Sequence, residues 1–342
     1  MRRRARTTGI WAIVAATAAA AETSPHLVFR FDGAPAERFG GATAAIGDVD
    51  GDGVPDLAVG APGADGAATA AGRVEVRSGA TGLVRLELAG DSAFDRTGSA
   101  VAGPGDLDGD GVPDLVVGAP SGTPPAGTIE ARSGSDGALL WSVVGAAAGD
   151  RFGATIAAVG DVDGDGIGDV VVGAPDHDGG GFGAGRGEVR SGATGAALWG
   201  IDGGAVLDRL GLAVAGVGDV DGDGTADVAL GSPLADVGAF NGGAVLVRRG
   251  DTGAPLGAVA GAAVLDQFGF SVDGAGDLDG DGRADLAVGI PGHDGGGTDA
   301  GRVEVRRGLD GATLLAIDGF AAGETFGFVA GIGDVDADGV PD

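Results

Sequence analysis

Aspartates recur along this chain at a spacing that suits a hard metal cation. The pattern Asp-x-Asp-x-Asp-Gly-x-x-Asp occurs six times, and the aspartates of its first copy are Asp48, Asp50, Asp52 and Asp56. Carboxylates that alternate around a tight glycine turn converge on one point, and the backbone carbonyl of Val54, at the seventh position, can join them. Such oxygen ligands are typical of Ca²⁺. The twelfth position holds Val59 instead of the glutamate of an EF-hand loop, so the ninth-position aspartate or water must complete the coordination.

Every copy of the pattern supplies the same candidate metal ligands, the four aspartates and the seventh-position carbonyl. They are Asp48, Asp50, Asp52, Val54 and Asp56; Asp106, Asp108, Asp110, Val112 and Asp114; Asp161, Asp163, Asp165, Ile167 and Asp169; Asp219, Asp221, Asp223, Thr225 and Asp227; Asp277, Asp279, Asp281, Arg283 and Asp285; and Asp334, Asp336, Asp338, Val340 and Asp342. Asp-Gly sequences also form plain solvated turns, but six identical patterns are hard to obtain that way. Four crowded carboxylates repel one another unless a cation lies between them. We therefore predict structural Ca²⁺, about one ion per complete loop.

The acidic patterns mark an internal repeat of 55 to 58 residues. In the first unit, an alternating segment follows the acidic pattern at residues 72–77, with Val74 and Val76 on one face and charged side chains on the other. A glycine-rich turn and an apolar segment, such as residues 139–144 in the second unit, complete each repeat. Each unit thus predicts four short strands, and no segment of the mature chain has helical periodicity. This unit is typical of a blade of a β-propeller, so we predict an all-β fold with four-stranded blades.

The combined motifs resemble the FG-GAP repeat family, the blades of integrin α-subunit propellers and of many secreted bacterial proteins. Phe152-Gly153, the acidic loop 161–169 and Gly173-Ala174-Pro175 match the three parts of the family's motif. The Phe-Gly pair is replaced by Thr97-Gly98 and Leu210-Gly211 in two units. The resemblance covers nearly the whole mature chain, and it implies that the calcium loop joins the first two strands of a blade. It also implies closure by an N-terminal strand, a part that residues 26–31 could play.

Both ends of the chain carry predictions of their own. Four arginines precede an apolar run at residues 9–21, which is too short to span a bilayer and ends in three alanines. We predict a signal peptide over residues 1–21, with a retained anchor as the alternative, and no other transmembrane segment. The propeller then occupies residues 22–342. Six units are visible, and the last stops before its second strand. We therefore expect a propeller that is incomplete at the C-terminus, with six or seven blades when complete.

The composition excludes several functional classes. The chain has 21 basic and 50 acidic residues, a net charge of −29, which argues against nucleic-acid binding. The absence of cysteine excludes a thiol nucleophile and a zinc–thiolate site. His177 and His293 occupy matching positions of two units, so they recur because the repeat recurs. Trp141 and Trp199 lie in fourth-strand segments and are expected to pack. We predict that the chain is not an enzyme.

These observations favour a secreted or cell-surface calcium-binding module of adhesion type, with the bacterial periplasm as the alternative compartment. Its expected partner is an extracellular protein or glycan. Two alternatives stay open: the chain is the non-catalytic propeller of a larger extracellular hydrolase, or it is a structural envelope protein. An Arg-Gly-Asp tripeptide occurs at Arg249-Gly250-Asp251. It occupies a recurring turn of the repeat, where other units have Arg-Ser-Gly, and we attribute it to ordinary sequence drift.

Overall fold

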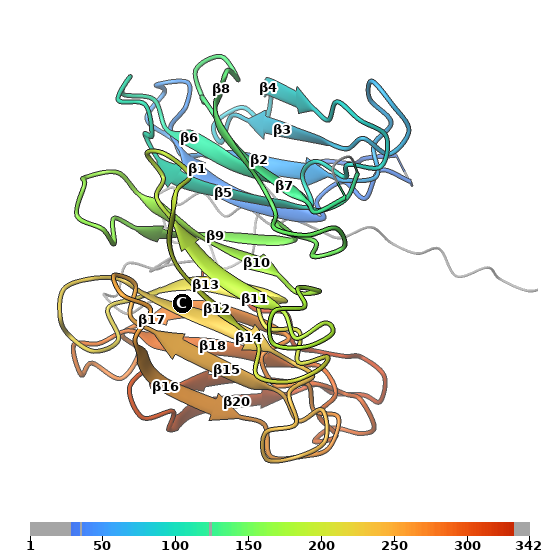
Figure 1. The fold of residues 1–342 in the computed structure, drawn as a ribbon, viewed down its shortest axis with the longest axis vertical. Helices are drawn as coiled ribbons and strands as arrows, with labels where there is room; N and C mark the ends of the chain where they lie inside the picture. The colour runs from blue at the N-terminus through green and yellow to red at the C-terminus, as the bar shows by residue number, and fades with distance from the viewer. Residues whose placement is uncertain (1–28, 35, 123–124, 332–342) are drawn as a thin grey trace, which may run out of the picture.

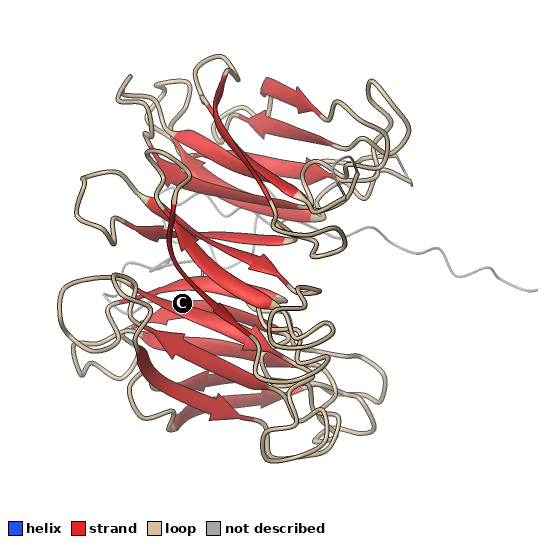
Figure 2. Ribbon diagram, in the orientation of Figure 1, coloured by secondary structure: helices blue, strands red, loops and turns tan. Residues whose placement is uncertain are grey.

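The computed structural model describes residues 29–34, 36–122 and 125–331. Within these residues it contains twenty strands and no helix, and the strands form five four-stranded antiparallel sheets (Figures 1 and 2). In every sheet the strands are ordered as in the chain, so each repeat unit forms one sheet. We call these sheets blades 1 to 5.

The strand bounds repeat closely from blade to blade. Blade 1 contains β1 (Ala42–Gly47), β2 (Asp56–Ala61), β3 (Arg73–Arg77) and β4 (Val84–Ala89). Blade 2 contains β5 (Ala100–Gly105), β6 (Asp114–Ala119), β7 (Thr128–Arg132) and β8 (Leu139–Val144). Blade 3 contains β9 (Thr155–Gly160), β10 (Asp169–Ala174), β11 (Arg186–Arg190) and β12 (Ala197–Asp202). Blade 4 contains β13 (Ala213–Gly218), β14 (Asp227–Ser232), β15 (Ala244–Arg248) and β16 (Pro255–Ala260). Blade 5 contains β17 (Ser271–Gly276), β18 (Asp285–Ile290), β19 (Arg302–Arg306) and β20 (Thr313–Asp318).

The first strands of the blades lie side by side in chain order, β1 next to β5, then β9, β13 and β17. The blades therefore follow one another around an arc, from blade 1 at one end to blade 5 at the other (Figure 1). The second strand of each blade is buried along nearly its whole length, whereas the fourth strand has only exposed and half-buried residues. This gradient from an inner to an outer strand is the arrangement of propeller blades, and the predicted β-propeller fold is confirmed.

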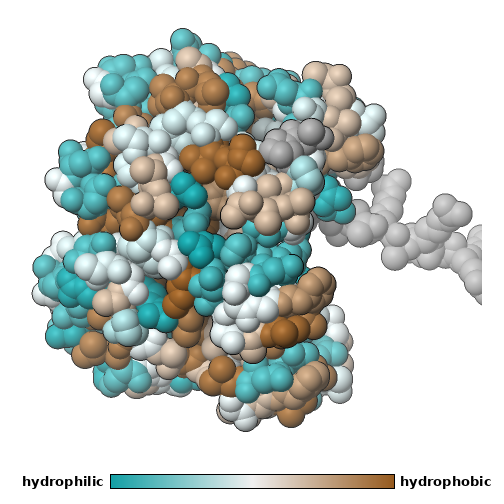
Figure 3. Space-filling model, viewed as in Figure 1, coloured by the Kyte–Doolittle hydropathy of each residue, from teal (hydrophilic) through white to brown (hydrophobic). Residues whose placement is uncertain are grey.

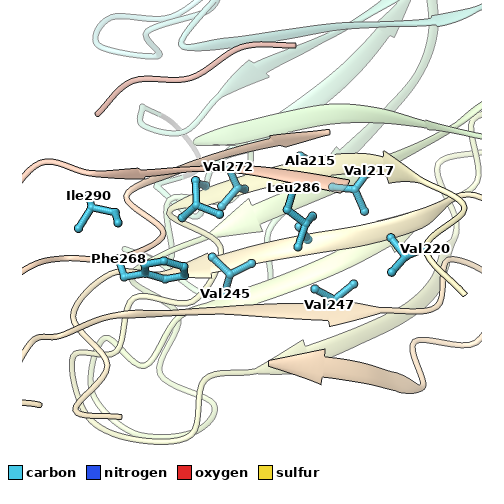
Figure 4. Packing of buried hydrophobic residues seen from close by; sticks show 12 residues of the cluster. Ala215, Val217, Val220, Val245, Val247, Phe268, Val272, Leu286 and Ile290 are labelled. Carbon is cyan, nitrogen blue, oxygen red and sulfur yellow. The ribbon is translucent and has the colours of Figure 1, made fainter. Parts of the chain in front are cut away.

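The hydrophobic core lies between neighbouring blades. Figure 4 shows it for blades 4 and 5, where Val217 and Val245 of one blade face Val272 and Leu286 of the next. Most of these side chains are valine, leucine or alanine, and Phe268 is the one buried aromatic side chain of this cluster. Small side chains suffice here because the sheets approach closely enough for backbone atoms to touch.

Glycines make that close approach possible at a matching point of each blade boundary. A Cβ atom on Gly173, in β10, would lie 2.0 Å from the carbonyl oxygen of Gly211 in the next unit, and Gly211 itself has a φ of +81°. The same contact recurs at the other boundaries, with 1.8 to 2.2 Å for Gly60, Gly118, Gly231 and Gly289. The Phe-Gly pair of one unit thus packs on the Gly-x-Pro segment of the unit before it. Where phenylalanine is replaced, Thr97 and Leu210 are still buried.

The two tryptophans pack across blade boundaries, in line with the packing role expected from the sequence. Trp141, in β8, donates a hydrogen bond from Nε1 to the carbonyl of Gly192 in blade 3 (2.6 Å), and Trp199 makes the equivalent bond to Gly250 (2.6 Å). Trp141 also lies against Gly195, in the turn between β11 and β12. Phe29 lies against Gly82, the equivalent glycine of blade 1. Phe29 therefore lies against blade 1 at the place where Trp141 and Trp199, from the fourth strands of blades 2 and 3, lie against the blades that follow them.

Several predictions fall outside the described residues. The predicted signal peptide at residues 1–21 is one of them. The sixth acidic loop is another, with Asp334, Asp336, Asp338, Val340 and Asp342. Within the described residues, no helix has the length and apolar character needed to cross a membrane.

The glycine contact generates a prediction about stability. Gly173→Ala forces a methyl group into the backbone of the next blade, so we expect it to lower the free energy of unfolding by about 3 kcal/mol. Gly257→Ala is the matched control, since a Cβ on Gly257 would meet only a carbonyl oxygen at 3.8 Å. Urea denaturation measures both. Equal stability of the two variants would show that the blades do not depend on this contact.

Candidate metal centres

The acidic loops occupy corresponding positions in all five blades, between the first and second strands. We number them loops 1 to 5, comprising residues 48–56, 106–114, 161–169, 219–227 and 277–285. The ninth residue of each loop is the first residue of the blade's second strand. Neighbouring loops lie close together, since a Cβ on Gly218, before loop 4, would meet Ala284 of loop 5 at 3.0 Å. We call this the acidic end of the blades. The resemblance predicted this strand connection, and it is confirmed.

A glycine positions each loop at the end of the first strand. Gly47 precedes loop 1 with a φ of +83°, and the register between β1 and β2 shifts between Ala45 and Gly47. The glycines that precede the other four loops also have positive φ angles, from +64° to +108°. A β-bulge with a left-handed glycine turns the strand and re-aims the residue after it. That residue is the leading aspartate of the loop.

The leading aspartate folds the loop around itself. Asp48 Oδ1 accepts a hydrogen bond from the Gly51 N–H (2.8 Å), and its Oδ2 accepts one from the Gly53 N–H (2.7 Å). The equivalent bonds occur in all five loops at 2.6 to 2.8 Å. In loop 2, the backbone N–H of Gly111 is the main reason why the pKa of Asp106 is lowered.

The ninth-position aspartate is buried and ties the loop to another turn of the same blade. Asp56 Oδ2 accepts a hydrogen bond from the Val49 N–H (2.9 Å), and its Oδ1 accepts one from the Gly79 N–H (2.9 Å) between β3 and β4. The same pair of bonds occurs in the other four blades. Burial raises the pKa of Asp114, Asp169, Asp227 and Asp285, and that of Asp227 reaches about 6.

Three of the four aspartates of each loop converge. The carboxylates at the first, third and ninth positions each offer an oxygen, and these oxygens lie within 4.8 Å of one another in all five loops. The fifth-position aspartate is outside this group, and its Oδ1 accepts a hydrogen bond from the seventh-position N–H, as in Asp52 and Val54 (2.9 Å). The roles of the fifth-position carboxylate and of the seventh-position carbonyl therefore remain predictions.

The chemistry of these groups fits a hard divalent cation. Every converging donor is a carboxylate oxygen, the ligand type that Ca²⁺ prefers. In loop 1, Asp50 Oδ1 is buried and has no hydrogen-bond partner among the described residues. A buried, unpaired carboxylate oxygen is costly unless a cation faces it. The residues present can therefore hold such an ion.

The structure adds a group that the sequence analysis missed, arginines that contact these carboxylates. Arg249 contacts Asp221 and Asp223 of loop 4, Arg307 contacts Asp279 and Asp281 of loop 5, and Arg85 contacts Asp50 of loop 1. Arg249 and Arg307 occupy the turn position that Ser78, Ser133 and Ser191 occupy in the other blades. Aligning the repeat units reveals this exchange, but only the fold shows that the turn adjoins the loop.

The two histidines lie at the opposite end of the blades from the acidic loops. His177 Nδ1 lies 2.9 Å from Asp150 Oδ2, and His293 Nδ1 lies 3.3 Å from Asp266 Oδ1. Each histidine follows the second strand of its blade, and each aspartate lies in the connection that leads into that blade. Their equivalent partners agree with the interpretation that they recur with the repeat.

The shifted pKa values predict different titration of two loop positions in calcium-free protein. By NMR of the carboxyl carbons, Asp227 should titrate with a midpoint near 6 and Asp106 below the usual 3.8. Because the folded-state pKa of Asp227 is raised, its ionisation should destabilise the metal-free fold as the pH rises from about 4 to 6. Asp106 should contribute stability that is lost as the pH falls through its lowered pKa. Equal midpoints for both carboxyls would contradict this electrostatic picture.

Comparisons with known proteins find the same repeat in all five described blades. The FG-GAP repeat profile matches residues 39–76, 97–138, 152–189, 211–247 and 268–305, more than half of the chain. Integrin alpha-V of Gallus gallus is 36% identical over 102 residues, covering 28% of this chain and 10% of that relative. Integrin alpha-IIb of Homo sapiens is 43% identical over 94 residues, covering 25% of this chain and 9% of that relative. The chain thus spans about a tenth of the length of these relatives.

Two solved structures align with most of this chain. The V. cholerae biofilm matrix protein Bap1 aligns with a TM-score of 0.44 and 19% identity over 81% of this chain and 39% of that chain. Saccharomyces cerevisiae Sqt1 aligns with a TM-score of 0.48 and 14% identity over 81% and 60% of the two chains. The family assignment does not depend on them, because the repeat profile matches every described blade from its Phe-Gly position into its third strand or the turn after it. The chain belongs to the FG-GAP repeat family.

Proposed function

We propose that this chain is a calcium-binding propeller module that acts outside the cytoplasm and binds an extracellular protein or glycan. The observation that carries the proposal is the convergence of three aspartate oxygens in each of five equivalent loops. Membership of the FG-GAP family and similarity to integrin alpha subunits support an adhesion-type role. The predicted signal peptide at residues 1–21 supports export to the extracellular space or the cell surface.

The calcium in this proposal is structural. Each loop links the first strand, the second strand and the turn between the third and fourth strands of its blade through the leading and ninth aspartates. A bound divalent ion supplies positive charge among carboxylates that would otherwise repel one another. Affinities of about 0.1 mM and free calcium of about 2 mM give roughly 1.8 kcal/mol for each independent site. Six sites would add on the order of 10 kcal/mol, comparable with the stability of a typical domain.

The opposite end of the blades offers the side chains suited to ligand binding. Phe182, between β10 and β11, and Phe240, between β14 and β15, are 71% and 61% exposed. The Leu207 N–H donates to the carbonyl of Phe182 and the Leu265 N–H to that of Phe240, both at 2.9 Å, and both leucines have positive φ angles. Exposed bulky side chains on a strained backbone are a feature of binding loops. The surface in Figure 3 likewise shows separate hydrophobic patches among hydrophilic ones.

Two alternatives follow from the same geometry. A non-catalytic propeller within a larger extracellular hydrolase would keep the calcium loops and direct its exposed loops to a polysaccharide or to a catalytic domain. A structural envelope protein would keep the calcium loops and have no specific ligand. Binding assays separate the structural envelope protein from the adhesion-type module and from the hydrolase propeller. The gene sequence beyond the codon for Asp342 separates the adhesion-type module from the hydrolase propeller.

Removal of calcium should destabilise the fold strongly. We expect the melting temperature in millimolar CaCl₂ to fall by more than 10 °C in excess EDTA, because each emptied loop leaves its carboxylates unscreened. Asp163→Asn should remove the contribution of one calcium site, about 1.8 kcal/mol, from the calcium-dependent part of the free energy of unfolding. Differential scanning calorimetry measures both effects. A melting temperature that is the same with and without calcium would refute the structural role of the ion.

The exposed phenylalanines should contribute to ligand capture. On an array of extracellular-matrix proteins and polysaccharides, we expect the native chain to bind at least one ligand in a calcium-dependent manner. The double variant Phe182→Ser/Phe240→Ser should bind that ligand at least tenfold more weakly. Leu83→Ser, a change at an exposed leucine in the turn between β3 and β4 at the acidic end of the blades, is the control. The melting temperatures of all three proteins should agree. Capture of no ligand by the native chain would favour the structural envelope alternative.

A further inference from the structure

Loops 4 and 5 already contain a positive charge supplied by the protein. Arg249 Nη1 lies 3.0 Å from Asp221 Oδ2 at the third position of loop 4, and Nη2 contacts Asp223 at the fifth position. In loop 5, Arg307 Nη2 lies 2.6 Å from Asp279 Oδ2, and Nε lies 3.8 Å from Asp281 Oδ2. Each guanidinium therefore contacts carboxylates that are predicted ligands of a metal ion.

A single side-chain exchange creates this difference between blades. The backbone of the turn is the same in each case, because the Arg249 N–H donates to the Ala254 carbonyl just as the Ser191 N–H donates to the Ala196 carbonyl, both at 2.9 Å. In blades 1 to 3 the position holds a buried serine, Ser78, Ser133 or Ser191. A serine hydroxyl carries no charge, and the hydroxyls of Ser78 and Ser133 make hydrogen bonds within the turn.

The other described loops have fewer arginine contacts than loops 4 and 5. Among the described residues, no arginine contacts an aspartate of loop 2 or loop 3. In loop 1, Arg85 Nε lies 3.2 Å from Asp50 Oδ2, but the side chain of Arg85 is half exposed and contacts one loop carboxylate only. Loop 4 has a second neighbouring cation, since a Cβ on Gly222 would lie 3.8 Å from the guanidinium of Arg283.

The turn also fits less closely where arginine is present. The bond from the turn glycine to the ninth aspartate is 2.8 to 2.9 Å in blades 1 to 3, as for Gly192 and Asp169. It lengthens to 3.2 Å between Gly250 and Asp227 and to 3.4 Å between Gly308 and Asp285. The same two blades therefore combine an added guanidinium with a looser link between turn and loop.

We propose that loops 2 and 3 and loops 4 and 5 form two classes of divalent-cation site, and that Arg249 and Arg307 set the class. Loops 2 and 3 bind calcium tightly, whereas loops 4 and 5 bind it weakly because an incoming ion must displace an arginine from the third and fifth carboxylates. The inference rests on the proposed calcium function. Its physical basis is competition, since one guanidinium and one divalent cation cannot occupy the same carboxylates without strong repulsion.

The same arginines should lessen the effect of calcium removal on blades 4 and 5. In the absence of calcium, a guanidinium screens part of the repulsion among the carboxylates. One end of the blade row would then keep its loops folded at low calcium, while loops 2 and 3 would require the ion. Arg249 of the Arg-Gly-Asp tripeptide is thereby assigned to its own blade, where it also pairs with Asp251 at 3.0 Å.

The test is a calcium titration of the full chain after removal of metal with EDTA. Isothermal titration calorimetry of the native chain should resolve tight and weak sites. In Arg249→Ser/Arg307→Ser, which restores the residue found in the other blades, two equivalents should move into the tight class, with an affinity gain on the order of tenfold to a hundredfold. The melting temperature of this variant in EDTA should be lower than that of the native chain, whereas the increase caused by calcium should be larger.

Further variants separate charge from packing. Arg249→Gln/Arg307→Gln keeps long side chains and should give the same redistribution, and Ser191→Arg should move one equivalent from the tight to the weak class. Arg96→Ser removes an equal charge at the opposite end of the blades and should leave the titration unchanged. An unchanged number of tight sites in both double variants would overturn the inference alone. Absence of calcium uptake by the native chain would overturn the proposed function as well.

Discussion

The buried carboxylate at the ninth position of each acidic loop is the interaction on which each blade depends. Asp169 accepts one hydrogen bond from the Val162 N–H within its own loop and another from the Gly192 N–H in the turn between β11 and β12. These bonds fix the loop and the turn to the start of the central strand. They also place a buried negative charge beside the carboxylates at the first and third positions. The same residue therefore links parts of the blade and adds negative charge that repels the neighbouring carboxylates unless a positive group offsets it.

The molecule offsets this charge in more than one way. Backbone N–H groups surround the leading aspartate, and arginines reach the carboxylates of loops 1, 4 and 5. Loops 2 and 3 lack an arginine contact among the described residues. Equivalent loops in a repeat protein can thus share a backbone and differ in local charge, since a side chain outside the loop supplies that charge. A repeat profile that scores the aspartates alone does not register this difference.

Close packing of the blades depends on glycine in the same way that the loops depend on aspartate. Gly173 and Gly211 bring two backbones into contact at a point where any side chain would collide. Valine and alanine can then fill the remaining space, which explains how a chain with 4% aromatic residues forms hydrophobic cores between its blades. The Phe-Gly and Gly-x-Pro motifs are thus two sides of one blade boundary, and the replacements Thr97 and Leu210 are tolerated because the glycine makes the closest contact.

The sequence by itself determined the local features of this protein: four strands per unit, the position of each acidic loop, and the residue types that suit a hard cation. These follow from period-2 alternation, glycine turns and carboxylate spacing, all of which act within a few residues. Tertiary structure alone decided which groups from distant positions meet. It brought three carboxylates of each loop together, left the fifth-position aspartate outside that group, and placed Arg249 and Arg307 against loops 28 residues earlier in the chain. Such contacts depend on the folding of third and fourth strands back along the blade, which no local spacing in the sequence specifies.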